Sequence, residues 1–233
     1  MLNFVRRIKR WQRAKETARL RESHLGAHSV IHPTAQVLGW KNVQIGERTI
    51  ISEHCWLNVN DRESGETAIS IGSHCFFGRR NFLSSGSRIV IGDYCLTGVD
   101  CHFLGSDHVM DDPFRPYLTT GTTGGGEIIV GPNCWFGASI EVLKGTTIGY
   151  GCIIGAGAVV RGQIPPLSVV VGNPGRIIKR YDVRTKQWVA IADFSSAAEK
   201  EYPSEAEYLA RLRQAAPTFR GPLVASGSDF GDL

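Results

Sequence analysis

The chain has 233 residues, of which 42% are apolar and 21% are charged, and its formal net charge is +4. This length suits one domain with appendages. No uninterrupted apolar run reaches 18 residues, so no transmembrane helix is expected. The first 24 residues are basic throughout and lack an apolar core, so no secretory signal peptide is expected either.

Residues 1–29 are predicted to form a basic amphipathic helical segment. Residues 1–23 carry eight basic side chains against Glu16 and Glu22, and their apolar residues recur at helical spacing. One interpretation is a cap that packs its apolar side on the open end of the region that follows. The other is peripheral contact with an anionic membrane surface, at its inner face. We favour the cap, and no nucleic-acid binding is expected because the rest of the chain is not basic. The apolar residues of the helix are Phe4, Val5, Ile8, Trp11 and Ala18.

Residues 30–181 repeat every six residues, most clearly at 130–165, where an apolar residue begins each hexad and a glycine often follows it. This period matches neither the 3.6 of a helix nor the 2 of a strand. It indicates a chain that runs extended, turns and repeats, and such repeats bury their apolar side only by stacking. The pattern predicts a β-helix domain of about six coils with three hexads in each. In 130–165 the expected inward residues are Val130, Phe136, Val142, Ile148, Ile154 and Val160.

The six cysteines share one position in the repeat, four places after the start of a hexad. That position lies at a corner of the coil, where a small side chain is needed, and a free cysteine behaves as a small apolar residue. There is no Cys-x-x-Cys pair. We therefore predict six buried structural thiols, which fits a reducing, cytoplasmic setting. They are Cys55, Cys75, Cys95, Cys101, Cys134 and Cys152.

The longest interruption of the repeat, 104–128, is the expected active-site loop. It carries a histidine within a cluster of acids and then a glycine-rich half, and loops of this length are usually functional or disordered. A polar excursion at 58–70 is a second candidate wall of the site. Residues 182–233 are predicted to form a C-terminal extension, with a short helix at Ser204–Gln214 and a loose tail.

Several stretches together resemble the hexapeptide-repeat acyltransferases, and most of all the branch of maltose, galactoside and xenobiotic O-acetyltransferases with its polysaccharide-modifying relatives. These stretches are the Ile-Gly hexads, the histidine-bearing loop, NCWFG, IIGAGAVV and IPP…VVVGNPGRIIKR. The resemblance implies an all-β fold, a left-handed parallel β-helix, that assembles as a homotrimer with active sites between neighbouring subunits. It also implies acetyl-CoA as the donor, a saccharide as the acceptor, and no metal.

The resemblance places His108 as the catalytic base. A sugar hydroxyl is a poor nucleophile and must lose its proton as it attacks a thioester, and the imidazole exchanges protons near neutral pH. Asp107 or Asp111 is expected to orient the ring. Of the other histidines, His74 is expected to be solvated, and His102 to be either a wall residue or a partner of the reacting groups.

For the donor, the resemblance assigns small residues to the pantetheine arm, cations to the phosphates and Trp135 to either the acetyl channel or wall packing. The chain has Arg161-Gly162-Gln163 where many relatives have Thr-Lys and an acid, so either Arg161 supplies the charge one place earlier or the phosphate contact differs. The donor candidates are Trp135, Gly137, Ala138, Ala156, Arg161, Arg176 and Lys179. The acceptor candidates are Ser84, Asp100, Arg115 and Tyr117.

Three other interpretations remain open. An amino-sugar N-acetyltransferase would share the same fold and donor. A γ-type carbonic anhydrase would need three zinc-binding histidines, whereas His102 and His108 have five residues between them and no evident third partner. A non-catalytic β-helix scaffold would use the loop only to bind a partner.

Overall fold

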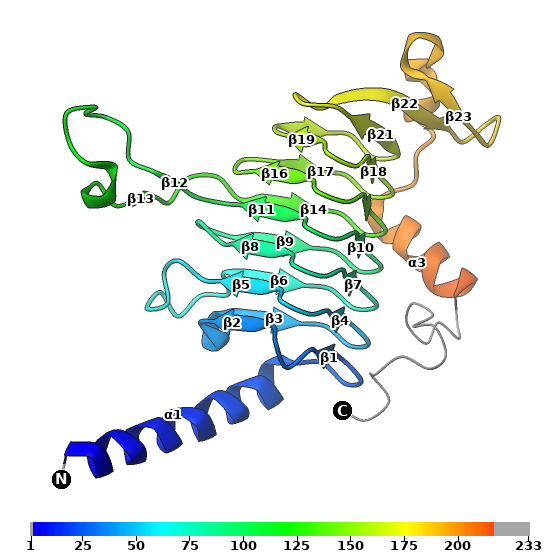
Figure 1. Cartoon of the computed structure of the whole chain (residues 1–233). Coiled ribbons are helices and arrows are strands. Elements are labelled where there is room, and N and C mark those ends of the chain that lie inside the picture. Colours follow the sequence, from blue (N-terminus) through cyan, green and yellow to red (C-terminus); the bar gives the residue numbers. More distant parts are fainter. Residues whose placement is uncertain (1, 217–233) are drawn as a thin grey trace.

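The computed structural model describes residues 2–216, except for several side chains of the N-terminal helix, and shows a triangular solenoid of parallel strands. Its three faces are sheets A, B and C, which Figure 1 shows stacked in coils from bottom to top. Sheets A and C have six strands each, which agrees with the predicted number of coils.

The strands of each sheet follow in the order of the stack. Sheet A holds β3 (Val43–Ile45), β6 (Ile69–Ile71), β9 (Ile89–Ile91), β14 (Ile128–Val130), β17 (Thr147–Ile148) and β20 (Gln163–Ile164). Sheet B holds β1 (Val30–Ile31), β4 (Ile50–Ile51), β7 (Phe76–Phe77), β10 (Leu96–Thr97), β15 (Trp135–Phe136), β18 (Ile153–Ile154), β21 (Ser168–Val171), β22 (Arg176–Asp182) and β23 (Gln187–Ala190). Sheet C holds β2 (Gln36–Leu38), β5 (Trp56–Asn58), β8 (Phe82–Ser84), β11 (His102–Leu104), β16 (Glu141–Leu143) and β19 (Val159–Val160). The described residues also form short 3-10 helices: η1 (Trp40–Asn42), η2 (Tyr117–Thr119) and η3 (Ile191–Asp193).

The core lies inside the triangle and is built from the predicted inward positions. All six hexad starts of 130–165 are at most 2% exposed. The ring of Phe103 in sheet C meets that of Phe136 in sheet B edge to face, with 5.3 Å between centroids. Stacking coils therefore buries one apolar side chain per hexad, as the period predicted.

All six cysteines are free and buried, as predicted. Several thiols donate a hydrogen bond to a carbonyl of the coil above, such as Cys75 to Gly92 at 3.2 Å and Cys101 to Gly137 at 3.0 Å. Burial raises the pKa of Cys55 to about 11, and that of Cys101 likewise to about 11. These thiols are therefore protonated structural groups near neutral pH.

The lower end of the solenoid meets the C-terminal part of helix α1 (Leu2–His24). Leu20 packs against the core, and the His24 ring donates from Nδ1 to the carbonyl of Val43 at 2.9 Å. Trp11 is 59% exposed and Ala18 is also exposed, so the predicted packing of the apolar stripe is wrong for these two residues. The other stripe residues, Phe4, Val5 and Ile8, have side chains outside the described part. Figure 1 shows the rest of α1 projecting away from the body.

The upper end is closed by a change of strand direction. β22 runs antiparallel to β21, and β23 pairs antiparallel with β22, so β22 crosses the predicted boundary between residues 181 and 182. Two helices follow, α2 (Ser196–Glu199) and α3 (Glu205–Ala215). Ser204 caps α3 in a reciprocal capping box with Glu207, which confirms the predicted helix. The predicted loose tail lies outside the described residues.

Within residues 2–216, no helix has both the length and the apolar character that crossing a membrane requires.

Candidate active site

An arm leaves the solenoid after β11 of sheet C and returns before β14 of sheet A, so it projects from the corner between these sheets (Figure 1). Its base is a two-stranded ribbon of β12 (Asp107–His108) and β13 (Thr122–Thr123). Lys144, on the next coil, holds the ribbon through Asp107 Oδ2 at 2.9 Å and Thr123 Oγ1 at 3.1 Å. The tip carries apolar side chains in the open, since Phe114 is 95% exposed and Leu118 is 90% exposed.

His108 is exposed at the base of this arm, and its ring is oriented by the backbone. Its Nδ1 lies 3.1 Å from the carbonyl oxygen of Gly121 across the ribbon. A carbonyl only accepts hydrogen bonds, so Nδ1 carries the hydrogen and Nε2 keeps a lone pair for a proton. The predicted orientation of the ring by Asp107 is wrong, because that carboxylate pairs with Lys144.

A polar cluster joins the arm to the coil below it. The amide oxygen of Asn60 accepts hydrogen bonds from Ser84 Oγ at 3.0 Å and from the backbone of Gly86 at 3.2 Å. The amide nitrogen of Asn60 donates to Ser106 Oγ at 3.1 Å, at the start of the arm. The excursion that follows β5 therefore lies at the same corner as the arm, and it contacts the predicted acceptor residue Ser84. Asn60 was not predicted, because its partners are 24 to 46 residues away in sequence.

The predicted donor positions Gly137, Ala138 and Ala156 follow β15 and β18 at a different corner, between sheets B and C. A Cβ on Gly137 would lie 2.6 Å from the backbone nitrogen of Ala156, so no side chain fits there. These small residues leave the backbone of successive coils uncovered along the corner. Trp135 lies two residues before Gly137 on sheet B and is 52% exposed, so it does not serve as buried wall packing.

The structure does not bring the three predicted cations together. Arg176 and Lys179 are exposed on β22, at the top of sheet B. Arg161 follows β19 at the corner between sheets C and A, which is the corner of the arm. His108 and Trp135 likewise lie at different sides of the triangle within one chain.

Asp100, predicted to contact the acceptor, is held by an arginine instead. Its two carboxylate oxygens accept from Arg80 Nε at 2.7 Å and Nη2 at 2.6 Å. The guanidinium lowers the pKa of Asp100, and the bidentate pair engages both carboxylate oxygens in this structure, so a contact of Asp100 with the acceptor stays a prediction. Arg80 lies one coil away in the stack, 20 residues from Asp100 in sequence. The hexad pattern did not single out this pairing.

Two further histidines are engaged. His102 Nδ1 lies 2.9 Å from Glu141 Oε1 on the outer face of sheet C. The His74 ring stacks on Tyr94 with 4.9 Å between centroids, and its side chain is only 16% exposed, so the expectation of a solvated histidine is wrong. Among the described residues, no group of three or more His, Cys, Asp or Glu side chains could hold a metal ion.

Comparisons with known proteins find relatives that are named as acetyltransferases. Residues 127–161 match the family described as the hexapeptide repeat of succinyl-transferase. The Mycobacterium tuberculosis protein Rv3034c, described as a probable acetyltransferase, is 35% identical over 140 residues, which are 59% of this chain and 45% of that protein. Escherichia coli K12 WbbJ, whose name assigns it provisionally to O-acetyl transfer in lipopolysaccharide biosynthesis, is 46% identical over 61 residues, which are 26% of this chain and 31% of that protein. The chain thus spans less than half the length of these two relatives.

Solved structures agree on the fold. AntD, an N-acyltransferase from Bacillus cereus determined with dTDP and 3-hydroxybutyryl-CoA, superposes with a TM-score of 0.59 at 18% identity. The superposition covers 84% of this chain and 96% of AntD. The architecture is therefore the parallel β-helix that the repeat predicted, with the left-handed coil that the family resemblance implied.

Proposed function

We propose that this chain, a member of the hexapeptide-repeat acyltransferases, moves an acetyl group from acetyl-CoA to a hydroxyl of a saccharide. The observation that carries the proposal is the orientation of His108, whose Nδ1 is held by the Gly121 carbonyl at 3.1 Å while Nε2 is left to take a proton. The relatives named as acetyltransferases support acetyl transfer, and the similarity to WbbJ supports a saccharide hydroxyl as the acceptor.

In this mechanism the acceptor hydroxyl attacks the thioester carbon while Nε2 of His108 removes its proton. The bond from oxygen to carbon forms, and the carbonyl becomes a tetrahedral oxyanion. The carbon–sulfur bond then breaks, and the proton passes from Nε2 to the CoA sulfur, which leaves as a thiol. The fixed Nδ1–H bond to Gly121 stabilises the imidazolium between these two steps.

The donor is assigned to the corner between sheets B and C. The uncovered backbone beside Gly137, Ala138 and Ala156 suits the amide groups of the pantetheine arm. Arg176 and Lys179 on β22 supply positive charge for the phosphates at the top of that corner. Arg161 is not included, because it lies at the other corner.

The proposed assembly is a homotrimer. Within one chain, His108 and the donor corner lie at different corners of the triangle. The arm of a second copy therefore has to reach the donor corner of the first. The exposed Phe114 and Leu118 at the tip of the arm also need a surface to cover them. Ser84, Arg115 and Tyr117 are then the proposed acceptor contacts around His108. Matched sugars with and without a free amine distinguish this reaction from N-acetylation.

We expect acetyl-CoA to bind the purified chain in a saturable way at one molecule per chain, measured by calorimetry with free CoA as the comparison. A double substitution of Arg176 and Lys179 by glutamine should weaken binding by about a hundredfold or more, because two ion-assisted contacts are lost and each is worth roughly 1.5–3 kcal/mol. Arg161→Gln is the matched control and should change little. The absence of binding up to millimolar concentration would favour the scaffold interpretation.

The N-terminal helix is proposed to make peripheral contact with anionic membranes at their inner face. Arg6, Lys15 and Arg19 are exposed on α1, and Trp11 is available to enter the headgroup region. We expect the chain to sediment with vesicles that contain phosphatidylglycerol and not with vesicles of phosphatidylcholine alone. Substitution of the three cations by glutamine should abolish this, since each contributes about 1 kcal/mol near an anionic surface. Substitution of Lys186, Lys200 and Arg211 by glutamine removes the same charge elsewhere and should leave vesicle binding unchanged. An equal loss of vesicle binding in both variants would contradict the proposal.

A further inference from the structure

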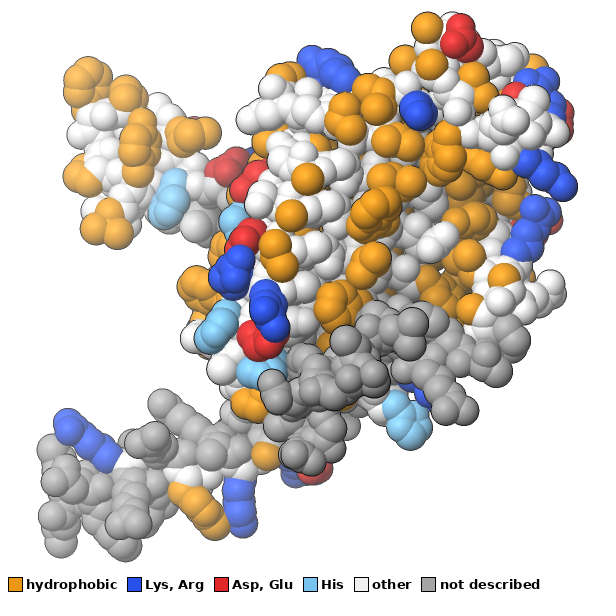
Figure 2. All heavy atoms as spheres, turned by 45° about the vertical axis from the view of Figure 1, so that its right-hand side comes forward, with side chains coloured by type: hydrophobic (Ala, Val, Ile, Leu, Met, Phe, Trp, Pro, Cys, Tyr) orange, Lys and Arg blue, Asp and Glu red, His pale blue; other side chains and the backbone are white. Residues whose placement is uncertain are grey.

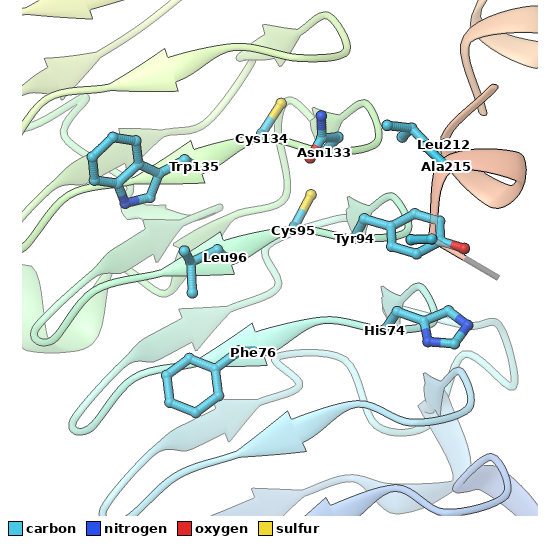
Figure 3. Close-up of a pocket in the computed structure, with 11 residues that line it drawn as sticks. His74, Phe76, Tyr94, Cys95, Leu96, Asn133, Cys134, Trp135, Leu212 and Ala215 are labelled. Atoms are coloured by element: carbon cyan, nitrogen blue, oxygen red, sulfur yellow. The ribbon is translucent and has the colours of Figure 1, made fainter. Parts of the chain in front are cut away.

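The outer face of sheet B carries a groove to which the proposed reaction assigns no role. Its floor is formed by Phe76, Leu96 and Trp135, which are neighbours in register on β7, β10 and β15. The cavity has a volume of about 480 Å³. Figure 3 shows these three side chains at successive levels of the stack, with Leu212 and Ala215 of α3 on the opposite side.

The groove continues upward past Trp135. A second cavity of about 420 Å³ shares Trp135 and Asn133 with the first and reaches the aromatic rings of Tyr181 and Trp188 in the C-terminal hairpin. Figure 2 shows the hydrophobic side chains gathered along this face. We call the two cavities together the sheet B groove; it runs along the stack and passes Trp135 halfway.

The wall of the groove is held in place by specific contacts of α3. Asn133 Nδ2 donates to the hydroxyl of Tyr208 at 2.6 Å, and the Tyr208 ring stacks on Tyr150 with 4.4 Å between centroids. Arg213 adds an ion pair with Asp93 at 3.3 Å. The groove is therefore a built feature, and its wall belongs to a part of the chain beyond the hexapeptide repeat.

The chemistry of the lining identifies the occupant. Aromatic side chains recur along the groove, and the polar groups that line it are the Asn133 amide, the His74 imidazole and the tyrosine hydroxyls. None of the residues that line either cavity is Asp, Glu, Lys or Arg. A sugar nucleotide would bring a diphosphate, which needs cations. A neutral sugar ring needs only an aromatic surface for its C–H face and hydrogen-bonding groups for its hydroxyls.

We propose that the sheet B groove binds several rings of a neutral glycan chain, so that the acceptor is an oligosaccharide or polysaccharide and not a sugar nucleotide. This inference rests on the proposed function, because it places the chain across Trp135, where the donor and the arm of a second copy meet. Successive coils lie about 4.8 Å apart. That spacing is close to the advance of one ring along a glycan, so each coil can offer one ring a surface.

The test is binding to immobilised neutral oligosaccharides of one to eight rings, with CoA present. The signal is expected to rise with chain length and to level off once the groove is filled. Trp188→Ala should weaken binding of the longer glycans by about tenfold, because one aromatic contact is lost. It should leave binding of a single sugar ring unchanged. Trp56→Ala removes a tryptophan of similar exposure from sheet C and should leave the binding of glycans of every length unchanged.

Binding that does not depend on length would overturn the proposal, as would a Trp188→Ala protein that keeps full binding. A lower oligomeric mass in Trp188→Ala would show that a second copy occupies the groove and would overturn it as well. Calorimetry with acetyl-CoA separates the two proposals. If the chain binds the donor but no glycan, only the assignment of the groove is contradicted. If it binds the glycan but no donor, only the proposed acetyltransferase activity is contradicted.

Discussion

Replacement of His108 by alanine is expected to lower acetyl transfer by roughly 10²–10⁴, the usual contribution of a general base. The loss should appear in kcat, because the ring acts on the reacting proton and not on the binding of acetyl-CoA. The fold should be unchanged, since His108 is exposed and makes one side-chain hydrogen bond, to Gly121. Initial rates with saturating acetyl-CoA and circular dichroism of the variant check both statements.

His102→Ala is the matched control for this experiment. His102 is half-exposed and, like His108, has an oriented ring, through Glu141 at 2.9 Å, but it lies on sheet C and not on the arm. We expect its substitution to cost less than tenfold. If instead His108→Ala keeps most of the activity and His102→Ala loses it, the base is the His102–Glu141 pair.

The His108→Ala variant also tests whether the active site lies between two copies of the chain. His108→Ala lacks the base, and Ala156→Trp blocks the exposed donor corner, so each homo-oligomer should be inactive. In mixed assemblies, random pairing gives one intact arm beside one intact corner in about a quarter of the interfaces. Recovery of about that fraction of activity on co-expression is expected. No recovery would mean that one chain supplies the whole site.

Asn81→Ala is expected to produce the largest loss of stability, about 3 kcal/mol. Asn81 is fully buried, and its amide oxygen accepts from the backbone N–H of Cys101 at 2.6 Å. Its amide nitrogen donates to Gly78 O at 2.8 Å and to Thr97 Oγ1 at 2.6 Å. Alanine leaves these buried groups without this partner, at a cost of roughly 1–3 kcal/mol for each unsatisfied group. The midpoint of urea unfolding measures the loss.

Asn81→Cys is the corresponding control. Cys55 and Cys101 occupy the equivalent place on the coils below and above, because Trp56, Phe82 and His102 are aligned in register. A thiol there can donate to a carbonyl, as Cys55 does to Gly78 at 3.1 Å. We therefore expect a smaller loss than with alanine. An equal loss in both variants would show that the volume of the side chain matters more than its hydrogen bonds.

The period of the sequence predicted the solenoid and its interior because each hexad start, such as Phe136 or Ile154, is buried by stacking alone. The thiols and the cap at Ser204 followed from equally local rules. The interruption of the repeat also placed His108 in a loop, which the structure shows to be a projecting arm.

The remaining features depend on which residues the stack aligns. Arg80 meets Asp100, and Asn60 meets Ser106, across coils whose lengths vary with each insertion. The hairpin β22–β23 and the wall formed by α3 have no hexad pattern, so the sheet B groove could not be foreseen from the repeat. Trp188 and Leu212 acquire their place in the groove only through that fold-back.

The two ends of the solenoid also decide whether molecules can polymerise. A stack of parallel coils has open edges whose free N–H and C=O groups would accept another molecule and continue into a filament. Here the top coil meets the antiparallel strand β22, and Leu20 and Leu25 cover part of the bottom coil. The upper end of the solenoid therefore does not match the lower end, and strands of two molecules cannot pair end to end in a continuous register. The length of the solenoid is thus set by a single chain.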